Sequence, residues 1–480
     1  MSLVKKIALI IVATLLVGAA IADEPRSIYT PQEFRADGFD SPNAKWSLTR
    51  SKESEHCVVF WAKEFGDDPN AASVPEELRV DVDDLLDKAE KIYATNVERL
   101  QFSAKPEKES RLDEYKLEIY LLYQHEWLAT GAGYDDVIGA LWVNPSTCKP
   151  VGEVIGHELG HTFQYQVYCD QLANGESRDH QSGFRYAHDG GFGNTIWEQC
   201  AQWQAWQDFP KAAFTPYQKD VWAKNCHRAF ENEWMRYQSY WFFYAVKDLH
   251  GADAIGAVWK ASRRPEDFLD AYRRVYCDDD PEKLADDLYY YASRAATYDF
   301  DELREFAPDE WIDAYRPEIV VNDEGAWQIA YASCPDESGF NAIPLDPKGY
   351  DGAVEVSFKS LPIGSPLAKD DPGVVALSRE REPKTATTRA YNAPTGAMKD
   401  ARSQFRYGFV ALCDDGKRVY GDDYRESEKT VQFEIPENAT RLFFVVAAVA
   451  DRHYRHKWDD DESNDLQLPY QISVRNAKPE

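Results

Sequence analysis

The sequence has little positive charge, few histidines and almost no long hydrophobic run. It contains 54 Lys and Arg against 83 Asp and Glu, which gives a net charge of −29. So strong a negative charge repels phosphate backbones and anionic lipid surfaces, so we do not expect nucleic-acid binding. Only ten of the 480 residues are histidines. Two of them, His157 and His161, are only four residues apart, a spacing that needs an explanation in a chain with so few histidines.

The long hydrophobic run lies at the N-terminus, from Ile7 to Ala22, directly after Lys5 and Lys6. With about 16 residues it is short for a membrane span of about 20, and it ends in the small-residue pattern of a cleavage site. No cysteine stands at that site, which argues against a lipoprotein. We expect residues 1–22 to be a signal peptide and the mature protein to be secreted or periplasmic, without a membrane span. A retained anchor is the alternative.

The eight cysteines all lie in the mature part, an even number in a chain that is bound for an oxidising compartment. We expect some disulfides, with Cys334 and Cys413 as the pair in the C-terminal part. Buried free thiols are the alternative, because a chain of this length does not need disulfides to be stable.

The N-terminal half alternates between strand-like and helix-like patterns. Strands are predicted at 55–62, 116–123 and 139–145, and a helix at 80–100. A helix around "GEVIGHELGHTFQYQVYCD" follows, then a Gly-, Asp- and Asn-rich loop at 170–194. Further helices are expected at 195–209, 229–251 and 265–277, with Gly251 as a stop signal.

The pattern changes near Val320. Beyond it, seven strand-like runs are separated by turn-rich or charged segments, which favours an all-β sandwich of about 150 residues. We therefore predict an α+β protein with two domains, at 23–319 and 320–480.

The most specific motif is H-E-x-x-H, formed by His157, Glu158 and His161. On a helix, histidines at i and i+4 point the same way and can bind one Zn²⁺, while the glutamate between them can act as a general base. Gly156 and Gly160 immediately precede the two histidines. Glycines are poor helix formers, so their presence suggests a close approach to another segment.

A catalytic zinc needs a third protein ligand and an open fourth position. The extended metzincin motif would require a glycine and a histidine where this chain has Gln164 and Val167, so that class is rejected. Glu198 is the leading candidate, because a carboxylate on an apolar helix needs a cation or another partner. The alternatives lie in the preceding loop, namely Glu176, Asp179, His180 and His188.

On "HELGHTFQ", "WEQCAQW" and "WDDDESNDLQLPYQI" the sequence resembles gluzincin metallopeptidases. In particular, it is similar to poorly characterised secreted proteins that pair a zincin-like domain with a C-terminal β-sandwich. The resemblance implies a small sheet with an active-site helix, a helical subdomain, and zinc-dependent hydrolysis of a protein or glycoprotein substrate with Glu158 as base. The long ligand spacing and the missing N-E-x-x-x-D signature depart from thermolysin-like enzymes, so specificity is not carried over.

Two further functional features are less specific. Tyr237 is our candidate for stabilising the developing oxyanion, with His188 and Tyr240 as alternatives. The acidic runs that open at Cys277 and Trp458 could bind Ca²⁺, but neither has EF-hand spacing, and solvated acidic loops are the commoner outcome. The alternative to a peptidase is an inactive or structural zincin-like protein that binds carbohydrate or protein.

Overall fold

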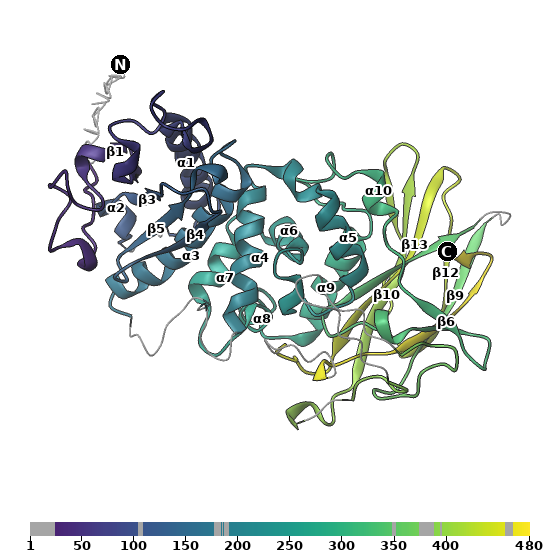
Figure 1. Cartoon of the computed structure of the whole chain (residues 1–480). Helices are drawn as coiled ribbons and strands as arrows, with labels where there is room; N and C mark the ends of the chain where they lie inside the picture. Colours follow the sequence, from purple (N-terminus) through teal and green to yellow (C-terminus); the bar gives the residue numbers. More distant parts are fainter. Residues whose placement is uncertain are drawn as a thin grey trace, which may run out of the picture.

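The computed structural model describes residues 25–103, 109–176, 184, 186, 192–347, 352–373, 388–393, 396–456 and 464–480. Within them the chain is an α+β protein with three five-stranded sheets. The molecule is elongated, with an N-terminal sheet at one end, helices in the middle and a β-sandwich at the other end (Figure 1). The expected signal peptide, residues 1–22, lies outside the described residues. Among the helices described, none is long and apolar enough to cross a membrane.

The N-terminal sheet has the strand order β1-β2-β3-β5-β4. Its three inner strands pair in parallel, and both edge strands are antiparallel to their neighbours. Helices cover one face, and Phe39 and Trp46 from the lead-in cover the other, so the inner strands are apolar on both faces. The strands are β1 (Ser51–Glu53), β2 (Cys57–Trp61), β3 (Leu117–Leu121), β4 (Ala129–Tyr134) and β5 (Ile138–Val143).

The inner strands lie where the sequence predicts them, but β4 was not predicted. Its sequence, ATGAGY, contains two glycines and no apolar alternation, so it has the pattern of a loop. The Asp135–Asp136 turn joins β4 to β5, and both residues have φ near +57° (56° and 58°), as a tight hairpin turn requires. Three helices belong to this part: α1 (Val82–Ala94), α2 (Arg111–Glu114) and α3 (Glu153–Ala173).

The middle of the molecule consists of helices. They are α4 (Phe192–Trp206), α5 (Pro216–Asn225), α6 (Trp241–His250), α7 (Ala254–Ala261), α8 (Phe268–Tyr276), α9 (Pro281–Ala295) and the short α10 (Asp309–Ile312). Gly251 ends α6 as predicted, with φ +104° and its N–H bonded to Lys247 O.

The predicted helix over 229–251 is wrong in its first half, because α6 begins only at Trp241. At the start of this segment the backbone bonds to a distant turn instead of forming a helix: Phe230 N donates to Ser338 Oγ at 2.9 Å. The Asn232 side chain accepts from Trp234 N at 2.9 Å, which favours a short 3₁₀ turn. Tyr237 is therefore not on a helix.

The acidic run at Cys277 opens helix α9. Asp280 is its N-cap and accepts from Glu282 N at 2.9 Å, and Pro281 occupies the first turn. Glu282 and Asp286 bind the buried Arg406 of the sandwich, both at 2.7 Å. These acids are engaged in capping and ion pairing. Most of the second acidic run, at 457–463, lies outside the described residues.

Two five-stranded antiparallel sheets make up the C-terminal part, with the orders β11-β10-β13-β8-β15 and β12-β9-β14-β7-β6. Their facing side chains share one core. The first sheet contains β8 (Phe340–Asp346), β10 (Ser403–Cys413), β11 (Arg418–Tyr420), β13 (Ala439–Ala450) and β15 (Lys478–Pro479). The second contains β6 (Ile319–Val321), β7 (Trp327–Ile329), β9 (Ala353–Ser360), β12 (Glu428–Glu434) and β14 (Tyr470–Arg475). The strand expected at 373–378 lies almost wholly outside the described residues.

The sandwich is not separated from the helices by solvent. The outer face of the first sheet, including Phe443 and Val445 of β13, belongs to the same apolar core as the helices. Helix α9 packs across β8, β10 and β13 on that face. The chain enters the sandwich at β6, next to the predicted boundary at 319–320, but the core is continuous across it.

All eight cysteines are buried free thiols, so the predicted disulfides are wrong. Cys334 packs in the core between the two sandwich sheets, whereas Cys413 ends β10 outside that core. The predicted pair therefore does not meet. These thiols act as small apolar side chains in a chain that is large enough to be stable without disulfides.

Candidate metal centre

Helix α3 carries the H-E-x-x-H motif and packs closely against α4. A Cβ added at Gly160 would lie 3.1 Å from Ala201 Cα, and one added at Gly156 would lie 3.2 Å from Ala205 Cα. The two glycines therefore let the helices approach each other closely, which explains their presence beside the histidines. This approach brings Glu198 of α4 to the histidines of α3.

The three candidate ligand atoms form a compact triangle. His157 Nε2 lies 3.1 Å from His161 Nε2 and 3.1 Å from Glu198 Oε2, and His161 Nε2 lies 3.3 Å from Glu198 Oε2. Zinc bonds of about 2.0 to 2.1 Å at tetrahedral angles would separate ligand atoms by about 3.3 to 3.4 Å. The donor set and its spacing therefore fit one zinc ion with only small adjustments.

Side-chain amides orient both histidine rings. His157 Nδ1 donates to Gln202 Oε1 and His161 Nδ1 donates to Gln164 Oε1, each at 3.0 Å. An N–H fixed at Nδ1 leaves the lone pair of each Nε2 directed into the triangle. Gln164 is itself held, because its Nε2 donates to Trp197 O at 3.0 Å and to Gln204 Oε1 at 2.9 Å.

The triangle favours a positive charge at its centre. Burial alone would lower the pKa of His161, but the Glu198 carboxylate raises this pKa to about 9. Burial would raise the pKa of Glu198, yet the two histidines hold it well below its usual range. In a metal-free protein a proton supplies that positive charge, and a metal cation would replace the proton.

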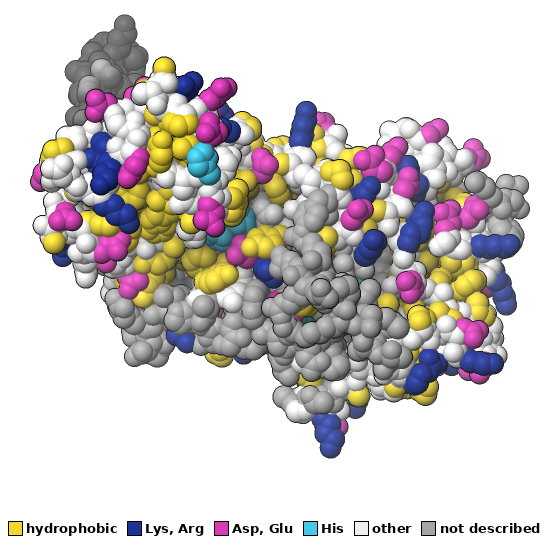
Figure 2. Space-filling model, viewed as in Figure 1, with side chains coloured by type: hydrophobic (Ala, Val, Ile, Leu, Met, Phe, Trp, Pro, Cys, Tyr) yellow, Lys and Arg dark blue, Asp and Glu magenta, His cyan; other side chains and the backbone are white. Residues whose placement is uncertain are grey.

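A cavity of about 480 Å³ opens beside the triangle. In Figure 2, histidine and hydrophobic side chains lie in a hollow between the N-terminal part and the helices. Glu158, His157, His161 and Glu198 all line this cavity, and its described wall has no lysine or arginine. Six aromatic side chains complete the wall: Trp127, Tyr165, Tyr168, Tyr186, Trp197 and Tyr237.

Strand β4 forms one side of the cavity and lies directly against α3. A Cβ on Gly131 would be 1.9 Å from the carbonyl oxygen of Glu158, and one on Gly133 would be 2.2 Å from the Tyr165 ring. Only glycine permits so close an approach. As the last strand of its sheet, β4 leaves one backbone edge unpaired among the described strands.

The structure distinguishes between the two tyrosines proposed for the oxyanion. Tyr237 lines the cavity, and its ring centroid lies 6.1 Å from that of His157. Burial, followed by the charge of Glu198, raises its pKa to about 12, so its hydroxyl keeps its proton at neutral pH. Tyr240 is fully buried, donates to Ala213 O at 3.0 Å and does not line the cavity.

Of the alternative third ligands, Glu176 follows the end of α3 and does not line the cavity. Asp179, His180 and His188 lie outside the described residues. Sequence reasoning missed the orienting amides Gln164 and Gln202. Their distance of three or four residues from a ligand on the same helix was the available signal.

Comparison with known proteins gives little functional information. None of the curated proteins compared matches this chain. One similar solved structure is that of the M60 catalytic domain with the CBM51-1 and CBM51-2 domains from Clostridium perfringens ZmpB, with 12% identity and a TM-score of 0.28. That match covers 93% of this chain but only 61% of the other, and so low a TM-score does not establish a common fold.

A family profile matches residues 21–480, which is nearly the whole chain. Its description is "Family of unknown function (DUF6055)". The chain therefore belongs to the family DUF6055.

Proposed function

We propose that the protein is a zinc-dependent peptidase of the gluzincin type. His157, His161 and Glu198 would hold the metal. The observation that carries the proposal is the triangle of ligand atoms, 3.1 to 3.3 Å apart, beside an open cavity. A purely structural zinc site closes its fourth position with protein, whereas this arrangement leaves one side open.

The residues at the cavity supply the other groups that peptide hydrolysis needs. When bound, zinc polarises the peptide carbonyl and lowers the pKa of a water molecule. Glu158 takes the proton from the attacking water and passes it to the nitrogen of the leaving amine. The Tyr237 hydroxyl, protonated at neutral pH, donates a hydrogen bond to the carbonyl oxygen as negative charge develops there.

Strand β4 offers a place for the substrate backbone. Ala129, Thr130, Gly131 and Ala132 all line the cavity, so an extended peptide could pair with the free edge and present a peptide bond to Glu158. The aromatic wall suits apolar side chains. A protein or glycoprotein substrate outside the cell is therefore the proposed partner, in agreement with the signal-peptide pattern of residues 1–22.

The test compares purified wild-type protein with Glu158→Gln, which keeps the size of the side chain but removes the base. Both should contain close to one zinc ion per chain. Cleavage of a mixed peptide library should fall by at least about a hundredfold in the variant, since general-base catalysis contributes about 10² to 10⁴ in rate. Glu153→Gln, an exposed position on the same helix, is the matched control and should cleave like wild type.

Two outcomes would favour the alternative, a zincin-like protein that binds carbohydrate or protein without cleaving it. One is equal cleavage by wild type and Glu158→Gln. The other is zinc-loaded wild type that cleaves no member of the library.

A further inference from the structure

The chain between α5 and α6, residues 226–240, is shaped by the β-sandwich; we call it the α5–α6 connection. Its backbone bonds to the first residue of β8 and to the turn that precedes this strand. Phe340 N donates to Cys226 O at 3.0 Å, and Asp336 N donates to His227 O at 2.8 Å. A Cβ on Gly339 would lie 1.9 Å from His227 O, so the two backbones are in direct contact.

A second contact comes from the segment that follows β13, at His456. Its Nε2 lies 3.1 Å from Asp465 Oδ1 and 3.0 Å from the Asn232 amide nitrogen, and its Nδ1 lies 3.3 Å from Glu233 Oε2. The ring is fully buried between these groups. Two buried carboxylates on either side favour the imidazolium form, so the contact is an ion pair that is shielded from water.

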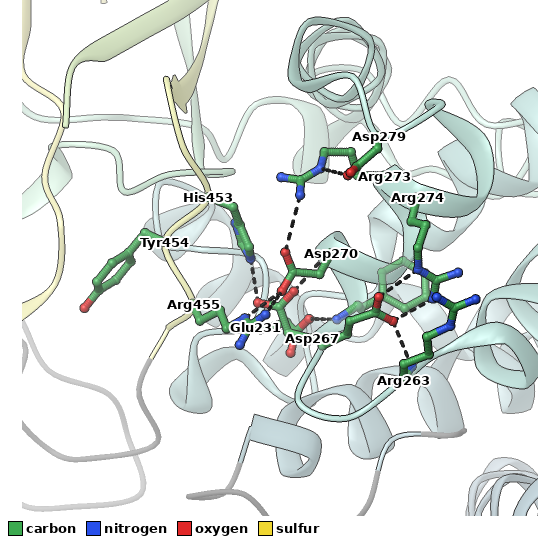
Figure 3. Close-up of polar contacts among 12 residues, drawn as sticks. Glu231, Arg263, Asp267, Asp270, Arg273, Arg274, Asp279, His453, Tyr454 and Arg455 are labelled. Atoms are coloured by element: carbon green, nitrogen blue, oxygen red, sulfur yellow. Dashed lines mark hydrogen bonds and ion pairs between the residues drawn. The ribbon is translucent and has the colours of Figure 1, made fainter. Parts of the chain in front are cut away.

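The neighbouring residues anchor the same segment to helix α8. His453 lies between two carboxylates, with Nε2 2.6 Å from Asp267 Oδ2 and Nδ1 3.1 Å from Glu337 Oε2. Figure 3 shows His453 and Arg455 facing Asp267 and Asp270 from the sandwich side. The α5–α6 connection joins this cluster, because Phe268 N donates to Glu231 Oε1 at 2.7 Å. These contacts hold residues 453–456 in place independently of the contact between His456 and Glu233.

The α5–α6 connection leads directly to the candidate metal centre. Arg236 Nη1 donates to Glu233 O at 2.9 Å, and the Arg236 guanidinium lies 5.1 Å from the centre of the Tyr237 ring. Gln202 Nε2 donates to Tyr237 O at 3.4 Å, and the same amide accepts from His157 Nδ1. A continuous set of contacts therefore joins His456 to Tyr237 and to a candidate zinc ligand.

We propose that His456 is a positioning residue for the candidate active site. Through its ion pair with Glu233, it fixes the non-helical α5–α6 connection and thereby the Tyr237 hydroxyl at the cavity. The sandwich then serves as a structural part of the active site, in contrast to a separate binding module. The expected effect on catalysis rests on the proposed function. The expected effect on the conformation of residues 226–240 does not.

The structural part is tested by hydrogen–deuterium exchange on the zinc-loaded full chain. His456→Ala should speed exchange at residues 226–240 by at least about tenfold, since it removes the buried ion pair between His456 and Glu233. Helices α3 and α4 should be unchanged. His56→Ala is the matched control, because it also removes a histidine–carboxylate pair, His56 Nδ1 to Glu90 Oε2 at 2.7 Å, but in the N-terminal part. Unchanged exchange at 226–240 would overturn the inference.

The kinetic part is a double-mutant cycle with Tyr237→Phe. His456→Ala should lower kcat by about 10- to 100-fold with KM within about twofold, because the lost interaction forms only as charge develops. The double variant should be no slower than the slower single variant. If the two losses multiply, His456 does not act through Tyr237 and the inference fails.

The exchange experiment and a second variant separate a failure of the proposed function from a failure of the inference about His456. If wild type cleaves no peptide, the proposed function fails, while the exchange experiment still decides whether His456 holds the connection. If His456→Ala does not fold, Asp465→Asn replaces it, because this variant keeps the shape of the pair and removes one charge. It should change exchange and kcat in the same direction, by a smaller factor, and no change in either would count against the role of His456.

Discussion

Substituting Gln164 by leucine should weaken zinc binding without touching a ligand. Gln164 is 1% exposed, and its amide accepts from His161 Nδ1 at 3.0 Å while it donates to Trp197 O and Gln204 Oε1. Leucine has a similar volume but cannot form any of these bonds. The His161 ring then loses the partner that directs its Nε2 into the triangle.

Loss of a group that orients a metal ligand typically lowers metal affinity about 10- to 100-fold, or about 1.4 to 2.7 kcal/mol. Each buried polar group left without a partner also lowers folding stability by about 1 to 3 kcal/mol. Gln164→Leu should therefore bind zinc 10 to 100 times more weakly and unfold at a lower temperature.

Competition with a chelator of known affinity measures the zinc dissociation constant, and thermal unfolding measures stability. Gln171→Leu is the matched control on the same helix, because Gln171 is also buried and donates to Lys260 O at 3.2 Å, but it contacts no histidine. It should lose stability and keep its zinc affinity. Equal zinc affinities in the two variants would refute the orienting role of Gln164.

Three further predictions follow from the site and its support. Glu198→Gln should fold but lose most of its zinc, as measured by metal analysis after dialysis; full occupancy would move the third ligand elsewhere. Burial lowers the pKa of His456, but Asp465 and then Glu233 raise it to about 10. The folded state therefore holds an extra proton between about pH 6.5 and 10. The stability advantage of wild type over His456→Gln should be greatest below pH 6.5 and disappear as pH rises through 10; an advantage that grows with pH would contradict this. A fragment of residues 320–480 should aggregate, because it exposes the apolar outer face of its first sheet; a monomeric, cooperatively unfolding fragment would show otherwise.

The sequence predicted those elements whose own residues determine their conformation. Strand β2, Cys57–Trp61, is a β-branched and aromatic run, and helix α3 has apolar residues at helical spacing. Strand β4 could not be predicted in this way. Its glycines are explained by the Glu158 backbone, 27 residues after Gly131, and by the Tyr165 ring, 32 residues after Gly133.

In the candidate site, too, the features set by neighbouring residues were predictable and those set by distant segments were not. His157, Glu158 and His161 are neighbours on one helix, so their spacing alone specified their common direction. The position of Glu198 depended on how closely α4 could approach α3. The two glycines indicated that some segment packs closely against α3, but not that this segment is α4. Tyr237 was expected on a helix over 229–251, yet that helix begins only at Trp241. The residue lines the cavity because segments of the sandwich hold the α5–α6 connection.

The run RLFFVVAAVA in β13 explains why the two predicted domains share a core. A strand with one solvent-facing side alternates between apolar and polar residues, whereas this run is continuous. Phe444 and Val446 point into the sandwich, and Phe443 and Val445 point toward the helices. A continuous apolar strand therefore indicated a sheet covered on both faces. Since helix α9 supplies the second cover, the helical part and the sandwich bury one another.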